Sequence, residues 1–123
     1  MIAADTSAWI DFTNGAQTAS ARRLEACLTD GSLVMPLPVL FEILSGPGLT
    51  RGARELFTAL PRLDASDGFW ERAGALRGAL LRRGLKVRSM DCLIAQSCLD
   101  HGMPLIAADR DYRHFVKAGL KLA

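Results

Sequence analysis

The stretch that decides the fold is MDCLIAQSCLDHGMPLIAADRDYRHF, which spans residues 90–115. Its first part predicts a helix that begins at Asp91 and ends at Gly102, because glycine readily adopts the backbone conformation that closes a helix. The apolar run PLIAA at 104–108 follows and predicts a buried strand. Acidic residues come directly after it, in ADRDY. This order predicts an α/β protein with polar side chains at one edge of its sheet.

The same alternation of short apolar runs and longer helical patterns extends over the rest of the chain. Strands are predicted at 2–4, 33–35, 104–108 and 120–122, and helices at 7–12, 18–29, 39–45, 50–59, 67–83 and 91–101. Ser7 is predicted to cap the first of these helices. Apolar strands separated by helices predict a mostly parallel sheet of four to five strands, with helices on both faces. Residues 1–123 are expected to form one domain.

Composition limits the class of protein. Half of the residues are hydrophobic and 23% are charged, which favours a globular chain over a disordered one. The net charge of +2 permits nucleic-acid binding without requiring it. Most of the basic residues are arginine, which suits phosphate binding, although a bias in the genome explains this equally well. Three cysteines without paired metal spacing, and no signal or membrane-spanning pattern, lead us to expect a cytoplasmic protein.

Acidic residues lie at the ends of the predicted strands and within the helices. Asp5 and Asp109 each follow an apolar strand directly, so parallel pairing would bring their carboxylates to one edge of the sheet. Glu42, within VLFEIL, and Asp91, at the start of DCLIAQ, are candidates to join them. Each residue also has an ordinary explanation, as a helix-start acid, a solvent-facing helix position or a turn acid.

Carboxylates that converge in this way favour a metal site. Like charges at one edge raise each other's pKa values unless a cation lies among them. Hard oxygen ligands suit Mg²⁺ or Mn²⁺, which can activate water for phosphodiester hydrolysis. Other chemistries have little support: His101 and His114 are isolated, Cys92 lacks a partner base, and no glycine-rich phosphate loop or serine nucleophile motif is present.

At this point the chain resembles the PIN-domain ribonucleases, in particular the VapC-type toxins of bacterial toxin–antitoxin pairs. The resemblance covers nearly the whole chain and rests on DTSAWID at 5–11, FEILSG at 41–46 and the stretch at 90–115. It implies an endoribonuclease that depends on Mg²⁺ or Mn²⁺ and cleaves RNA with a metal-activated water. It also implies a homodimer and a small cognate antitoxin that blocks the site. We expect this antitoxin to bind on helices 18–29 and 39–45.

The resemblance assigns roles to individual residues. Matched to the family, the four catalytic acids are Asp5, Glu42, Asp91 and Asp109, and the metal ligands are Asp5, Asp91, Asp109 and Asp111. Asp109 matches the fourth acid best, because it follows its strand directly, and Asp111 is the nearby alternative. Ser7 matches a polar position that helps to hold the cluster. A threonine is common in the family two residues before the fourth acid, and this chain has Ala107 there, which removes one hydroxyl.

An acidic pocket repels RNA, so basic residues must surround it. The candidates for phosphate contacts are Arg82, Arg83, Arg88, Arg110 and Arg113. A solvated helix end and a surface turn explain the same residues equally well.

Other functions remain open at the level of sequence. One is a PIN nuclease that acts in RNA maturation without an antitoxin, and another is a catalytically silent PIN-type binding module, which Ala107 favours. A phosphohydrolase of the HAD type would use Asp5 as a nucleophile. It would require a second aspartate at the position of Ser7, so this reading is disfavoured.

Overall fold

Short strands and helices alternate along the chain in this computed structural model, which describes residues 1–123. The strands are β1 (Ala3–Ala4), β2 (Met35–Pro36), β3 (Arg62–Leu63) and β4 (Leu105–Ile106). The helices are α1 (Thr6–Thr13), α2 (Ala19–Asp30), α3 (Leu37–Leu44), α4 (Arg51–Ala59), α5 (Phe69–Arg82), α6 (Ser89–His101) and the 3₁₀ helix η1 (Arg110–Ala118). None of the helices is both long enough and apolar enough to cross a membrane.

The strands form a parallel arrangement with β1 in the middle. β1 pairs with β4 and β2 pairs with β3, both in parallel. A parallel bridge between Ile2 and Leu33 connects the two pairs, and another between Leu105 and Leu122 adds the C-terminal segment. The resulting order is β3, β2, β1, β4 and the C-terminal segment, which confirms the predicted parallel sheet of four to five strands.

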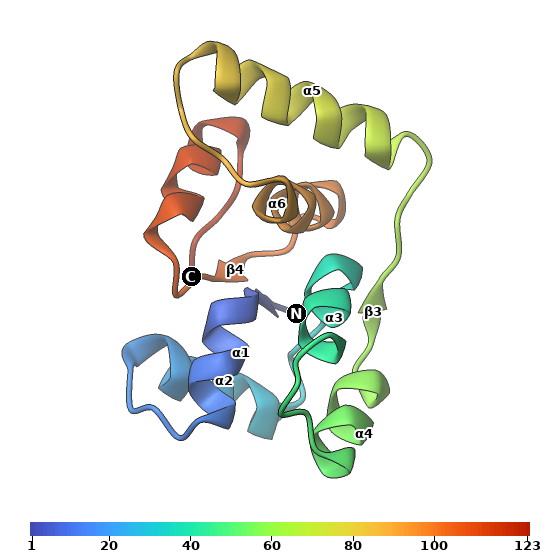
Figure 1. Cartoon of the computed structure of the whole chain (residues 1–123), viewed down its shortest axis with the longest axis vertical. Helices are drawn as coiled ribbons and strands as arrows, with labels where there is room; N and C mark the ends of the chain where they lie inside the picture. The colour runs from blue at the N-terminus through green and yellow to red at the C-terminus, as the bar shows by residue number, and fades with distance from the viewer.

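Helices lie on both sides of these strands. In Figure 1, α5, α6 and the red η1 segment occupy the upper part of the view, and α1 to α4 occupy the lower part. The core between them includes Trp9, whose ring packs edge-on against Phe57 with centroids 5.1 Å apart. Tyr112 and Phe115 of η1 are also buried. Gly102 ends α6 with φ 63°, as predicted from the sequence.

One local prediction is wrong, and two elements were not predicted. The cap of the first helix is Asp5, not Ser7, because α1 begins at Thr6 and the Asp5 carboxylate accepts the N–H of Ala8. β3 was not predicted, because Leu63 is its only buried residue and an exposed arginine precedes it. η1 was also not predicted, because the acids in ADRDY favour a turn and a 3₁₀ helix lacks the apolar spacing of an α-helix.

An ion pair holds α5 against α6, the helix that begins near Asp91. Nε and Nη2 of Arg72 donate to the two oxygens of Asp100 at 2.9 and 2.7 Å. Gln96 and Ser66 donate to the same carboxylate. The hydrogen bond from Arg72 is the main reason that the pKa of Asp100 lies below its usual value. This bidentate contact connects α5 to α6.

The Asp100 contact predicts a stability that depends on pH. Because the folded pKa lies below 3.8, the stabilisation is present above that pH and is lost as the pH falls through the folded pKa. We expect Asp100→Asn to lower the melting temperature at neutral pH, with a difference from the unmodified chain that shrinks below about pH 3. Circular dichroism melts across this range measure it.

The matched control is Glu55→Gln, which removes an exposed ion pair with Arg51 and should leave the melting temperature unchanged. A destabilisation by Asp100→Asn that stays constant down to the lowest pH would show that ionisation of Asp100 is not its source.

Candidate active site

A pocket of about 180 Å³ opens where β1 and β4 end, and it gathers the predicted catalytic acids. The carboxylates that line it come from four separate parts of the chain: Asp5, Glu42, Asp91 and Asp109. The other lining residues are Thr6, Ser7, Ile10, Arg88, Met90 and Tyr112. Asp111 is exposed and does not line the pocket. The structure therefore brings together the two acids predicted at strand ends, Asp5 and Asp109, with the two helix candidates, Glu42 and Asp91, and their catalytic role stays a prediction.

Asp5 is the buried member of the set, with only 1% of its surface exposed. Its Oδ1 accepts the N–H of Ala8 at 2.8 Å, and its Oδ2 accepts those of Ala108 and Asp109 at 3.1 and 3.2 Å. Burial raises the pKa of Asp5, the three N–H groups oppose this, and the charge of Asp109 adds to the rise. Asp5 thus caps α1 and joins the ends of β1 and β4 at the same time.

Glu42 is held by a threonine that the sequence analysis did not select. Thr6 Oγ1 donates to Glu42 Oε1 at 2.6 Å, and Glu42 Oε2 has no hydrogen-bond partner. Ser7, the predicted supporting residue, lines the same pocket but makes no side-chain hydrogen bond. Its position next to Asp5 could have suggested Thr6 as a site residue. The direction of its side chain, however, depends on the exact residue at which α1 begins.

Arg88 bridges the other two acids. Its Nε lies 3.2 Å from Asp91 Oδ2, and its Nη2 lies 2.7 Å from Asp109 Oδ2. The two carboxylates, Asp91 first, raise the pKa of Arg88. Tyr112 donates its hydroxyl to Asp91 Oδ1 at 3.2 Å, and the N–H of Asp111 donates to Asp109 Oδ1. Arg88 was predicted to contact RNA, whereas here its guanidinium binds the acids of the pocket itself.

The remaining arginines that were predicted to contact RNA lie outside the pocket. They are exposed, make no ion pair, and belong to the C-terminal end of α5 or to η1: Arg82, Arg83, Arg110 and Arg113. Their contact with RNA stays a prediction.

The donor chemistry of the pocket fits Mg²⁺ or Mn²⁺, although its acids do not form a ready-made cage. No three Asp, Glu, His or Cys side chains are close enough together to hold a metal ion as they stand. Mg²⁺ needs less than that, because it retains several waters and binds one or two carboxylates together with substrate phosphate. The free oxygen of Glu42 and the oxygens of Asp91 and Asp109 that Arg88 contacts supply such ligands.

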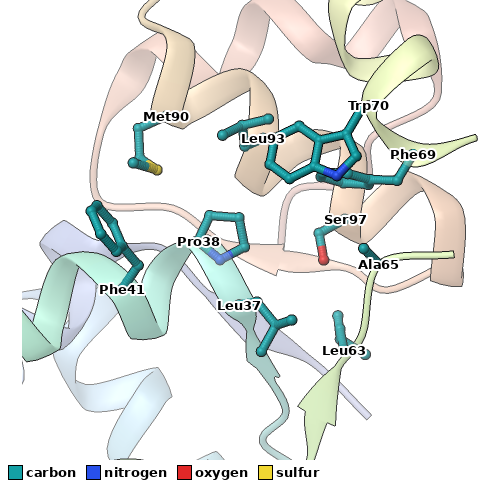
Figure 2. Close-up of a pocket in the computed structure, with 10 residues that line it drawn as sticks. All are labelled: Leu37, Pro38, Phe41, Leu63, Ala65, Phe69, Trp70, Met90, Leu93 and Ser97. Atoms are coloured by element: carbon teal, nitrogen blue, oxygen red, sulfur yellow. The ribbon is translucent and has the colours of Figure 1, made fainter.

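A second pocket, of about 350 Å³, is apolar (Figure 2). α3, α5, α6 and the segment from Leu63 line it, with Phe41 and Met90 at one end and Phe69 and Trp70 at the other. Phe41 is 63% exposed and Trp70 is 66% exposed. Ser97 provides its only hydroxyl, and no charged side chain lines it, so this apolar groove has no groups for catalysis. Large exposed apolar patches mark surfaces that bind proteins, membranes or ligands.

Comparisons with known proteins agree with the resemblance seen in the sequence. The PIN domain family model matches residues 2–118. The VapC ribonuclease Mb1587 of Mycobacterium bovis and ribonuclease VapC11 of Mycobacterium tuberculosis are each 33% identical to the chain over 119 residues, which cover 91% of this chain and 89% of the relative.

Among solved structures, VapBC2 from Rickettsia felis bound to a promoter DNA fragment has the same fold. The TM-score is 0.75 at 20% identity, with 100% of this chain and 98% of the other covered. The order of the parallel strands, the acidic pocket at their ends and these matches lead to one assignment. The chain belongs to the PIN domain family, among the VapC ribonucleases.

Proposed function

We propose that the chain is a metal-dependent endoribonuclease that acts as the toxin of a toxin–antitoxin pair. The observation that supports this most directly is the single pocket lined by four carboxylates, in a chain 33% identical to proteins named VapC ribonucleases. The reaction is hydrolysis of an RNA phosphodiester, in the cytoplasm.

In this proposal some side chains of the pocket hold the metal and others orient them. Glu42, Asp91 and Asp109 would hold Mg²⁺ or Mn²⁺, which when bound polarises the phosphate and lowers the pKa of water. Thr6 orients Glu42 by binding one of its oxygens, which leaves the other oxygen as the metal ligand. Tyr112 orients Asp91 in the same way.

Asp5 and the exposed arginines have the remaining roles in the proposed reaction. Asp5 faces the pocket from a fixed position, because both of its oxygens accept backbone N–H groups. Arg82, Arg83, Arg110 and Arg113 provide positive charge for the RNA backbone around an otherwise repulsive pocket. Ala107 supplies no hydroxyl, and the hydroxyls that do contact the acids are those of Thr6 and Tyr112.

The acids give the first test of this function. We expect Asp91→Asn and Glu42→Gln to reduce RNA cleavage by roughly 100-fold or more, because a charge at the reacting centre is lost while the side-chain shape stays. The measurement is cleavage of RNA by the purified protein with Mn²⁺, together with growth after induction in bacteria. EDTA should abolish cleavage by the unmodified chain.

Asp11→Asn is the matched control, since Asp11 lies outside the pocket and should leave cleavage unchanged. Activity that survives in both Asp91→Asn and Glu42→Gln would refute the site. A folded chain without any nuclease activity would favour the silent binding module, and cleavage without growth arrest would favour RNA maturation.

Asp5 should behave differently from the other acids. We expect Asp5→Ala to lower the free energy of unfolding by roughly 2 kcal/mol as well as activity, because three N–H groups lose their acceptor. Chemical denaturation measures this, with Asp91→Asn as the comparison. If Asp5→Ala were as stable as the unmodified chain, the three hydrogen bonds would not support the fold.

We propose that the small antitoxin docks on the apolar groove, with the chain itself forming a homodimer. The solved Rickettsia felis structure contains VapBC2 bound to promoter DNA. Of the two helices on which the antitoxin was predicted, α3 lines the groove through Leu37, Pro38 and Phe41, and α2 does not line it. Phe41 and Trp70 give this surface the exposed apolar area that a partner would cover.

A charge placed in the groove tests this docking site. We expect Phe41→Glu to leave growth arrest intact but to abolish its rescue by the co-expressed cognate antitoxin. The reason is that a buried unpaired charge opposes binding. Val116→Glu is the control, because Val116 is also exposed but lies on η1, away from the groove. Full rescue of the Phe41→Glu chain would place the antitoxin elsewhere.

A further inference from the structure

Arg88 contacts the acidic pocket in a way that differs from the ion pair of Arg72. It is the only basic residue that lines the pocket, and its guanidinium spans two different carboxylates, Asp91 and Asp109. By contrast, Arg72 directs two nitrogens at one carboxylate, that of Asp100, in the usual bidentate pair. Arg88 therefore bridges acids that come from α6 and from the end of β4, as a shared cation would.

The carboxylates are fixed and the arginine is free to move. The Asp91 and Asp109 side chains are 13% and 22% exposed, and each has a second hydrogen bond on its other oxygen. The Arg88 side chain is 71% exposed and projects from the residue just before α6. Its guanidinium can rotate into solvent without opening the core, whereas the acids stay in place.

The oxygens that Arg88 contacts are also those that the proposed function needs. Asp91 Oδ1 binds Tyr112 and Asp109 Oδ1 binds the N–H of Asp111, so Oδ2 of each residue is the atom left for a ligand. Arg88 contacts both Oδ2 atoms. A divalent cation and the Arg88 guanidinium therefore compete for the same two atoms.

We infer that Arg88 is a built-in counter-cation of the acidic pocket, which stabilises the metal-free chain and must be displaced before a divalent cation can bind Asp91 and Asp109. The inference rests on the proposed metal-dependent function. In this arrangement a cation faces Asp91 and Asp109 in either state, and the metal binds only as tightly as its attraction to the two carboxylates exceeds that of Arg88.

The test is a direct measurement of Mn²⁺ binding by isothermal titration calorimetry. We expect Arg88→Gln to bind Mn²⁺ about threefold to tenfold more tightly than the unmodified chain. Two partly exposed ion pairs no longer compete, and each such pair contributes only modestly. Arg22→Gln is the control for net charge, because Arg22 is exposed on α2 and makes no ion pair, and it should bind Mn²⁺ as the unmodified chain does.

A thermal measurement separates displacement from a merely structural role. Without metal, Arg88→Gln should melt at a lower temperature than the unmodified chain, because Asp91 and Asp109 repel each other without a counter-charge. Mn²⁺ should then raise its melting temperature by more than it raises that of the unmodified chain. A structural arginine would instead lower the melting temperature equally with and without Mn²⁺.

The outcomes distinguish this inference from the function on which it rests. If the unmodified chain binds Mn²⁺ and Arg88→Gln binds it equally or more weakly, the inference is overturned and the metal-dependent function stands. If neither protein binds Mn²⁺, or if RNA cleavage persists in EDTA, the metal-dependent function falls and the inference falls with it.

Discussion

The structure depends on the hydrogen bonds of one buried carboxylate, that of Asp5. Its oxygens accept N–H groups from the first turn of α1 and from the backbone just beyond β4, so three segments meet at one side chain. Burial raises its pKa, and the three N–H groups keep the charged form tolerable. The Asp5 carboxylate therefore caps α1 and, with the same two oxygens, holds the edge of the acidic pocket together.

Around Asp5, neutral hydroxyls set the orientation of the other acids. Thr6 binds Glu42 and Tyr112 binds Asp91, each through one carboxylate oxygen. Burial, with a further contribution from Asp91, raises the pKa of Tyr112, so its hydroxyl remains a donor over the whole physiological range. Fixed donors of this kind leave the second oxygen of each acid in a defined place, which is what a site for a small hard cation requires.

The sequence predicted the parts of the fold that local pattern controls. The apolar runs at 2–4 and 104–108 identified the central strands, and from them the meeting of Asp5 with Asp109. β3 was not predicted, because a two-residue strand with one buried side chain is too short to show an alternating hydrophobic pattern. Thr6 rather than Ser7 binds Glu42, and Arg88 points toward the acids rather than into solvent. Both depend on side-chain rotamers that tertiary contacts determine. The carboxylates could thus be predicted, but not the donors that hold them.

The contacts of Asp5 also set the order in which the molecule can be assembled. Ala108 and Asp109 lie 103 and 104 residues beyond Asp5, so the first strand and its last partners are at opposite ends of the chain. A chain emerging from the ribosome cannot close the pocket until nearly all of it has been made, and closing so long a loop is slow compared with local helix formation. A nascent or prematurely terminated chain therefore contains Asp5, Glu42 and Asp91 without the pocket that would unite them.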